Sequence, residues 1–316
     1  MAKQSNDFHK YGRGLESAEL PAFVSNARID DPNLYIPSPG LVDAVNVALS
    51  LGQPLLLTGE PGTGKTQLAY HVARFFNLGE PEVYPAQTTS TANDLFYRYD
   101  ALGHFQYAQN KDSKALNDEE MEERFIQYNA LGRAIRAGRR VVVLIDEIDK
   151  APRDLPNDLL FAIEKLRFKV PEIKDPATGG PRSYGTETAN RPVIILTSNS
   201  EKNLPDAFLR RVVYYHISFE EVDLNAILEK KAGLNPVQTA AVKSYFLDKI
   251  RTQRLKKLPA TAELIAWVVL LQQIGFPLEK LGTALAEPEK KSLHLSFSVL
   301  AKNRDDLREI KLLEPL

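Results

Sequence analysis

Three patterns follow one another directly between residues 54 and 76, and their order restricts the possible folds more than any other feature of the chain. Residues 54–58 form a short apolar run of the kind that becomes a buried strand. Residues 59–66 are rich in glycine, and the spacing of apolar residues then predicts an amphipathic helix over 65–76. A strand that passes through a glycine-rich turn into a helix indicates an α/β fold, in which helices connect parallel strands.

Residues 59–66 read Gly-Glu-Pro-Gly-Thr-Gly-Lys-Thr, which fits the pattern G-x-x-x-x-G-K-[ST]. In such a loop, backbone N–H groups wrap phosphate groups and the N-terminus of the following helix adds a favourable dipole. Lys65 is expected to reach the β and γ phosphates, and the hydroxyl of Thr66 is expected to bind Mg²⁺. The sequence therefore predicts a nucleoside triphosphate site. The residues expected to contact the nucleotide are Gly59, Glu60, Pro61, Gly62, Thr63, Gly64, Lys65, Thr66 and Gln67.

Two carboxylates follow a second apolar run, residues 141–145, in which four of the five residues are β-branched. Such a run is typical of a central parallel strand, and open α/β sheets bind ligands at the carboxyl ends of their strands. Asp146 is expected to hold Mg²⁺, directly or through water, and Glu147 to orient and activate the attacking water. An apolar strand that ends in acids also fits an ordinary solvated strand end, but its position downstream of the phosphate loop favours the catalytic interpretation.

Further candidates follow the next apolar run, at residues 193–197. If this strand lies beside the first, Asn199 is expected near the γ phosphate, where it would help to position the water; taken alone, it also fits a turn residue. A short helix is predicted over 204–211 and ends in Arg210 and Arg211. An arginine supplied by a neighbouring subunit stabilises the charge that develops in phosphoryl transfer, although a basic helix C-terminus also fits. Adjacent residues diverge by about 100° on a helix, so the two arginines should not share one role.

Strand and helix patterns alternate as far as about residue 220, which predicts a three-layer α/β sandwich with a parallel sheet. Beyond that point the patterns are helical, and the stretch at 264–274, which contains Trp267, is expected to be a core helix. The chain is therefore expected to divide into a leader over residues 1–36, a nucleotide-binding α/β domain over 37–220 and a small all-helical domain over 221–316.

Two segments inside the α/β region are predicted to be β-hairpins. Aromatic and polar residues alternate over 96–109, and the aromatic side chains are expected to pair across the hairpin, although they also fit substrate-gripping residues of an inserted loop. A helix is predicted over 117–138. The second hairpin is predicted over 168–183, with its turn at the glycine pair 179–180.

The composition excludes several functional classes. Lys and Arg number 40 against 41 Asp and Glu, which argues against bulk electrostatic binding to nucleic acid. With no cysteine, the chain has no thiolate nucleophile, disulfide or cysteine-ligated zinc, and its five histidines lack zinc-ligand spacing. Since no apolar run approaches the roughly 18 residues of a membrane-spanning helix, membrane insertion is not expected and the cytoplasm is the expected compartment.

The phosphate loop, the Asp146-Glu147 pair, Asn199 and the paired arginines, in this order, resemble the AAA+ ATPases, and more closely their MoxR-like group. The segments 96–109 and 168–183 resemble the helix-2 and pre-sensor-1 hairpin insertions of the wider clade. The resemblance covers about residues 36–316, with the helical remainder corresponding to the family's lid. It implies hydrolysis of ATP with Mg²⁺ and assigns the arginine finger to Arg211, with Arg210 as second candidate.

The resemblance also implies a homo-oligomeric ring, usually a hexamer, that acts as a chaperone-like remodeller or activator of a protein client. Members of the group often work with a partner that contains a von Willebrand factor A domain.

The sequence departs from the family at the start of the lid helix, where Ala260 stands in place of an arginine that senses nucleotide. Arg254, Lys256 and Lys257 are candidate substitutes, and the alternative is that the lid couples to nucleotide by another route. Together with Arg251 they form a basic cluster that is interpreted as a solvated helix face.

Two other functions remain open at this stage. One is a nucleic-acid motor or loader of the same fold, because fold does not dictate function. The other is a nucleotide-gated binding module in which hydrolysis is slow and the bound-state conformation is the output. The phosphate motifs do not read the base, so a preference for ATP over GTP is not fixed, and a residue near positions 35–39 is a candidate for contacting the base.

Overall fold

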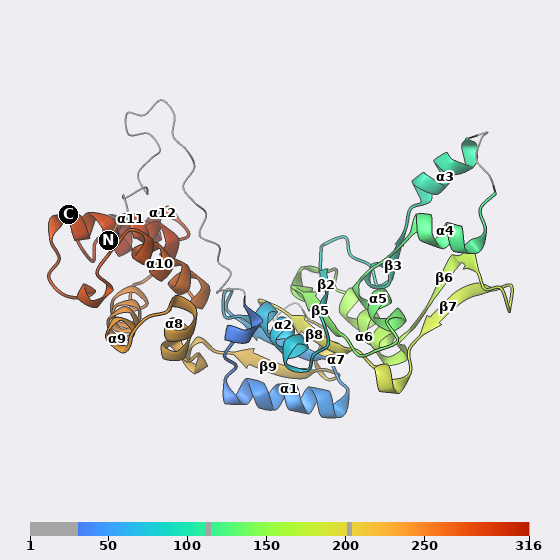
Figure 1. Cartoon of the computed structure of the whole chain (residues 1–316), viewed down its shortest axis with the longest axis horizontal. Helices are drawn as coiled ribbons and strands as arrows, with labels where there is room; N and C mark the ends of the chain where they lie inside the picture. The colour runs from blue at the N-terminus through green and yellow to red at the C-terminus, as the bar shows by residue number, and fades with distance from the viewer. Residues whose placement is uncertain (1–30, 111–114, 201–203, 316) are drawn as a thin grey trace, which may run out of the picture. The chain divides into compact units, whose positions relative to one another are not determined.

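The computed structural model describes residues 31–110, 115–200 and 204–315 (Figure 1). The chain divides into two compact units. The first, here called the sheet unit, comprises residues 39–59 and 65–217. The second, the helical unit, comprises the chain up to residue 38, residues 60–64 and the chain from residue 218 onward. Most of the leader expected over residues 1–36 lies outside the described residues.

A parallel sheet forms the centre of the sheet unit. Its strand order is β2-β5-β8-β1-β9, and each neighbouring pair is parallel. Every residue of β1 is buried, and β5 and β8 are buried over four of their five residues, because strands with neighbours on both sides and helices on both faces meet little water. The strands span Leu55–Gly59 (β1), Glu82–Pro85 (β2), Val142–Asp146 (β5), Val193–Thr197 (β8) and Val213–Ile217 (β9).

Helices cover both faces of this sheet, because alternate residues of a strand point to opposite sides. Leu56 belongs to a core shared with α5 and α6. Its neighbours Leu55 and Leu57 point to the other side of the sheet and are buried as well. α2 packs against β1, β5 and β8. α1 packs against β9 and β1. The predicted three-layer α/β fold is confirmed. The helices span Pro39–Leu51 (α1), Lys65–Phe75 (α2), Ala130–Arg136 (α5), Leu155–Lys165 (α6) and Asp206–Leu209 (α7).

The hairpin predicted over 96–109 is wrong. β3 (Tyr97–Tyr99) pairs with β4 (Ile126–Tyr128), and two helices, α3 (Ala101–Gln109) and α4 (Asp118–Phe125), lie between the two strands in the chain. Asp100 starts α3 by accepting a hydrogen bond from the N–H of Gly103 at 2.8 Å. A capping box at Asn117 starts α4.

The single helix predicted over 117–138 is therefore also wrong. It is divided into α4, β4 and α5, with Asn129 at the N-cap position of α5.

The second predicted hairpin is present as β6 (Arg167–Lys174) and β7 (Pro181–Gly185). This hairpin, the second insertion, packs against the first insertion, which is formed by β3, α3, α4 and β4. Both insertions project from the same end of the sheet unit (Figure 1). The rings of Phe96 and Phe168 stack with centroids 4.9 Å apart. The predicted pairing of aromatic residues across one hairpin is thus replaced by packing between two insertions.

The helical unit has its own core around Trp267, which is fully buried and donates a hydrogen bond from Nε1 to Ser296 Oγ at 2.8 Å. The predicted helical character of this region is confirmed, and it includes a π-helical turn at Tyr245–Ile250. None of the helices in the described part of the chain is long and apolar enough to span a membrane. The helices of this unit span Leu224–Ala232 (α8), Pro236–Ser244 (α9), Thr261–Gln273 (α10), Glu287–Leu300 (α11) and Arg304–Lys311 (α12).

Candidate nucleotide-binding site

The glycine-rich loop runs from the last residue of β1, Gly59, to the first residue of α2, Lys65. Gly62 and Gly64 have φ angles of 83° and 90°, which residues with a side chain rarely adopt. Thr63 tightens the turn, since its hydroxyl donates to the carbonyl of Glu60 at 2.8 Å. The backbone is therefore shaped as the sequence pattern requires for contact with phosphate groups.

Lys65 is buried, and its Nζ donates to the carbonyl oxygen of Gly59 at 2.8 Å. The ammonium group of Lys65 thus lies beside the glycine-rich loop that is expected to bind the phosphates. A buried lysine next to several backbone N–H groups makes the loop attractive to an anion. The local geometry therefore fits a polyphosphate.

Thr66 and Asp146 meet at the carboxyl ends of β1 and β5, where the hydroxyl of Thr66 donates to Asp146 Oδ1 at 3.1 Å. Both are oxygen ligands of the kind that Mg²⁺ prefers, and Mg²⁺ commonly takes only one or two protein oxygens, with phosphate and water completing its shell. Within the described ranges, no group of three or more His, Asp or Glu side chains is placed to hold a metal by itself. The donor set fits an ion that binds together with a nucleotide.

Glu147 follows Asp146 in a left-handed backbone conformation (φ 54°, ψ 48°), which is rare for a residue with a side chain. Its Oε1 accepts a hydrogen bond from Asn199 Nδ2 at 3.3 Å, and its carboxylate forms an ion pair with Lys150. The hydrogen bond that Lys150 Nζ donates to Glu147 Oε2 raises the pKa of Lys150. The structure thus brings Glu147 and Asn199 together from the ends of neighbouring strands β5 and β8.

Sequence reasoning did not single out Thr197, although it holds this end of the sheet together. Its hydroxyl donates to Asp146 Oδ1 at 2.5 Å and accepts from the backbone N–H of Glu147 at 2.9 Å. Asp149 was also missed, and its Oδ1 accepts from the N–H of Asn199 at 3.2 Å. The sequence signal that could have identified Thr197 is its place as the polar last residue of an otherwise apolar strand.

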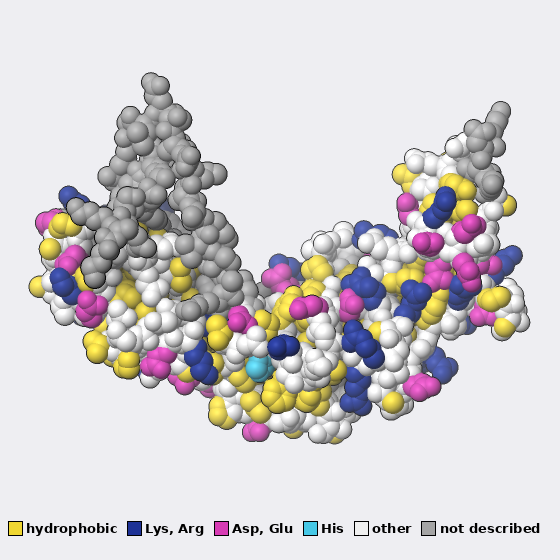
Figure 2. Space-filling view, in the orientation of Figure 1, with side chains coloured by type: hydrophobic (Ala, Val, Ile, Leu, Met, Phe, Trp, Pro, Cys, Tyr) yellow, Lys and Arg dark blue, Asp and Glu magenta, His cyan; other side chains and the backbone are white. Residues whose placement is uncertain are grey.

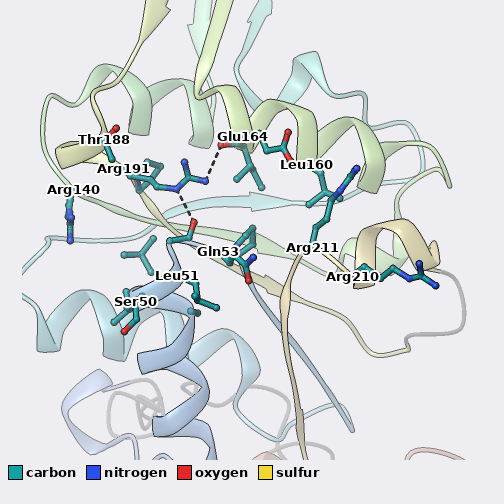
Figure 3. A pocket seen from close by; sticks show the side chains of 17 residues that line it. Ser50, Leu51, Gln53, Arg140, Leu160, Glu164, Thr188, Arg191, Arg210 and Arg211 are labelled. Carbon is teal, nitrogen blue, oxygen red and sulfur yellow. Dashed lines mark hydrogen bonds between the residues drawn. The ribbon is translucent and has the colours of Figure 1, made fainter.

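Arg210 and Arg211 lie elsewhere, at the amino end of β9, and line a pocket of about 560 Å³ (Figure 3). Arg191 and Gly52 also line this pocket, and Arg191 Nε donates a hydrogen bond to the carbonyl of Gly52 at 2.9 Å. In Figure 3, Arg211 points towards α6, whereas Arg210 points away from the other labelled side chains. Because the strands are parallel, this pocket and Glu147 lie at opposite ends of the sheet, about 16 Å apart along five-residue strands.

A parallel sheet in this strand order, with a phosphate loop between β1 and α2 and two acids at the end of β5, defines the class of P-loop nucleotide-binding proteins. Residues 54–212 match the family model described as an AAA domain of the dynein-related subfamily. Since this match covers half of the sequence, the chain belongs to that family of AAA ATPases, whose AAA domain binds nucleotide.

Solved structures with a similar arrangement include NtrX from Brucella abortus, in complex with ADP, at 16% identity and a TM-score of 0.44. That alignment covers 91% of this chain and 62% of the NtrX chain, so this chain spans less than two thirds of it. A candidate ATPase from Cytophaga hutchinsonii aligns at 14% identity and a TM-score of 0.37, over 90% of this chain and 92% of the other. No curated protein matches the chain.

Proposed function

We propose that this chain is a ring-forming ATPase of the MoxR type, which hydrolyses ATP with Mg²⁺ and uses the energy to remodel or activate a protein partner. The observation that carries this proposal is the meeting of Thr66, Asp146, Glu147 and Asn199 at the carboxyl ends of three adjacent strands. Open α/β sheets bind their ligands at this edge.

The proposed reaction is in-line attack of water on the γ phosphorus of ATP. Glu147 accepts a proton from the water while the bond between the γ phosphorus and the β–γ bridging oxygen breaks and ADP leaves. Asn199 keeps the Glu147 carboxylate in position through their hydrogen bond. Lys65 neutralises charge on the phosphates, and Mg²⁺, held by Thr66 and Asp146, would add a Lewis acid.

The location of the candidate arginine finger supports the proposed ring. Arg211 lies at the amino end of the sheet and Glu147 at the carboxyl end, so a chain cannot bring its own Arg211 to its own γ phosphate. A second copy that presents Arg211 would complete the site, and a closed ring repeats this contact around its circumference. A hexamer is the ring size that the MoxR resemblance implies.

The insertions are the proposed contact with the protein client. On α3, Leu102 and Phe105 are 66% and 59% exposed, and acidic side chains gather over α4 (Figure 2). Exposed apolar groups rimmed by charge are common at protein interaction sites. A partner with a von Willebrand factor A domain is included in the proposal because of the MoxR resemblance.

ATP is the proposed nucleotide, and Tyr35 is the proposed base contact. A side chain at Gly64 would lie 3.1 Å from Cε2 of the Tyr35 ring, so this ring packs directly against the phosphate loop within the helical unit. An aromatic ring there would offer a stacking surface to a purine.

The proposal is tested by measuring phosphate release from ATP and GTP at increasing protein concentration, with the mass of the particle determined at each concentration. Turnover per chain is expected to rise as the oligomer forms, and to be lost in Lys65→Ala. Turnover that is independent of concentration in a monomer would contradict the ring. Strongly salt-dependent binding of DNA or RNA would instead support a nucleic-acid motor.

A further inference from the structure

The tip of the phosphate loop, residues 60–64, packs within the helical unit against the start of α10. The carbonyl of Gly62 accepts a hydrogen bond from the N–H of Ala262 at 3.3 Å. A side chain at Gly62 would lie 3.3 Å from the Ala262 methyl group and 3.2 Å from Glu263 Oε2. The loop therefore lies in close contact with the start of α10, and a side chain at Gly62 would require its neighbours there to shift.

Ala260, which stands where the family has a nucleotide-sensing arginine, is at this contact. It is buried, and a side chain at Gly62 would lie 3.4 Å from its methyl group. The three basic residues named above as possible substitutes are all exposed, and Lys256 is engaged with Asp305 at 2.5 Å. The position that contacts the loop thus carries no charge of its own.

Arg251 supplies a cation to the loop from a different part of the fold, the end of the π-helical turn. Its Nη2 lies 3.6 Å from Glu60 Oε2, and its side chain is only 11% exposed. Two further contacts fix the guanidinium: Nη1 donates to the carbonyl of Pro259 at 2.5 Å, and the group lies 3.7 Å from the centre of the Phe219 ring. The interpretation of this residue as part of a solvated helix face is therefore wrong.

We propose that Arg251 neutralises Glu60 and thereby sets the affinity of the phosphate loop for nucleotide. Glu60 belongs to the loop that is expected to wrap the phosphates, so its negative charge disfavours the binding of a polyanion unless a cation compensates it. The resemblance assigns a nucleotide-sensing arginine to position 260; in this chain a positioning residue that touches the loop takes its place. This inference rests on the proposed nucleotide site.

Because the proposal depends on opposite charges at Arg251 and Glu60, it predicts how the ADP affinities of the single and double variants compare. Arg251→Gln retains a donor for the Pro259 carbonyl but removes the charge, and it is expected to weaken ADP binding by about fivefold. Glu60→Gln removes the repelling carboxylate and leaves the charge of Arg251 uncompensated near the loop, so alone it should tighten ADP binding slightly. Combined with Arg251→Gln, it should restore affinity to within about twofold of the wild type.

The experiment measures the dissociation constant of ADP for the full chain and its variants by displacement of a fluorescent ADP analogue, with thermal unfolding as a check on folding. Arg251→Lys is expected to stay near the wild type because it keeps the charge. The matched control is Arg254→Ala, an exposed arginine three residues further on, which should not change ADP affinity.

Three outcomes of the variant measurements would overturn the inference alone. A loss in Arg251→Gln that Glu60→Gln does not restore would mean that Arg251 only anchors Pro259 and Phe219. An unchanged affinity in Arg251→Gln would mean that the ion pair does not act on nucleotide. A loss in Arg254→Ala alone would assign the role to Arg254. If the wild type binds no ADP at all, the proposed function fails together with the inference, whereas each of the other outcomes leaves the proposed function standing.

Discussion

Glu147 is the residue at which local backbone strain and the proposed chemistry coincide. A non-glycine residue in the left-handed region costs on the order of 1 kcal/mol or more, so its surroundings must stabilise it. Thr197 does so by accepting a hydrogen bond from the Glu147 N–H at 2.9 Å. This conformation turns the carboxylate towards Asn199. The strained backbone conformation therefore orients the carboxylate of Glu147, the proposed base.

Glu147→Gln should abolish hydrolysis while leaving nucleotide binding intact. The amide has nearly the shape of the carboxylate but cannot accept the proton of the attacking water. Loss of a general base lowers rates by about 10²-fold or more. Phosphate release should fall to that extent, and the dissociation constant of ADP should stay within about twofold of the wild type, as expected for an isosteric change. A variant that hydrolyses ATP at a third of the wild-type rate would exclude Glu147 as the base.

Thr197→Val tests the residue that sequence reasoning missed. Valine fills the same volume but removes the acceptor of the Glu147 N–H and one of the hydrogen bonds to Asp146 Oδ1, which keeps the bond from Thr66; an unpaired buried polar group costs about 1–3 kcal/mol. Urea unfolding should show a loss of stability in this range, accompanied by lower turnover. Thr197→Ser retains the hydroxyl and is the control that should recover most of both. Equal stability of the valine and serine variants would show that the hydroxyl has no such role.

Sequence reasoning reaches some of these residues and not others for a physical reason. Lys65 and Thr66 follow from one contiguous pattern, because a single turn of backbone performs phosphate binding. Thr197 and Arg251 act through partners 51 and 191 residues away in the chain, respectively, so no local spacing marks them. Long-range pairs become visible only when the strands and helices are assembled.

At the scale of elements, the two insertions are joined by Glu122 of α4. Its carboxylate accepts hydrogen bonds from the hydroxyls of Tyr128 in β4 and Tyr184 in β7, both at 2.7 Å. It also forms ion pairs with Arg182 at 2.6 Å and Arg136 at 2.9 Å. The Glu122 side chain, only 12% exposed, thus connects the consecutive elements α4, β4 and α5 to β7, which lies more than forty residues further along the chain.

Glu122 should make the stability of the sheet unit depend on pH. Burial acts to raise its pKa, but hydrogen bonds from Tyr128, Tyr184 and Arg182 outweigh it and hold the pKa below its ordinary value of 4.5. A carboxyl group with a lowered pKa in the folded state stabilises the fold above its unfolded-state pKa, and this contribution is lost as pH falls through the folded-state pKa.

Glu122→Gln removes this titration and provides the test. At pH 7 the variant should melt about 3 °C or more below the wild type, and this gap should narrow as pH falls from 5 to 3. Thermal unfolding at several pH values measures the gap. Glu119→Gln, on the exposed side of the same helix, is the matched control and should melt with the wild type throughout. A gap that stays constant with pH would exclude titration of Glu122 as its origin.

The parts of the fold that sequence reasoning missed are short and paired over a long distance. β3 and β4 have three residues each and pair between Tyr97 and Tyr128, so the alternation that begins at β3 suggests a partner strand within 96–109, whereas the partner is at 126–128. The asparagines that start new helices, Asn117 and Asn129, lie in a stretch whose apolar spacing continues in a helical manner. By contrast, β1, β5 and β8 were predictable because central strands require unbroken apolar runs.

At the scale of the whole molecule, the proposed site is split between the two ends of one sheet. The loop, the two acids and Asn199 lie at the carboxyl ends of the strands, and Arg211 at the amino end of β9. Arg211 can therefore act in the proposed site only in an assembly in which the amino end of one copy's sheet meets the carboxyl end of another's. Because that contact is heterologous, it closes into a ring or continues as a filament.

Mixing two inactive variants tests whether one site is built from two chains. Arg211→Ala lacks the proposed finger but keeps Glu147, and Glu147→Gln lacks the base but keeps the finger. In a mixed ring, some interfaces combine an intact Glu147 from one copy with an intact Arg211 from its neighbour. Since an arginine finger contributes about 10³-fold or more to phosphoryl transfer, turnover in the mixture should rise far above that of either variant alone.

The control for this experiment is Arg210→Ala mixed with Glu147→Gln. If Arg211 is the finger, Arg210→Ala alone should retain most of its activity, because adjacent residues after a helix point in different directions and Arg210 points away from the other labelled side chains in Figure 3. Full activity of Arg211→Ala by itself, in a particle with the mass of one chain, would contradict both the shared site and the ring. Inactive Arg210→Ala that is rescued by Glu147→Gln, beside an active Arg211→Ala, would keep the ring and move the finger by one residue.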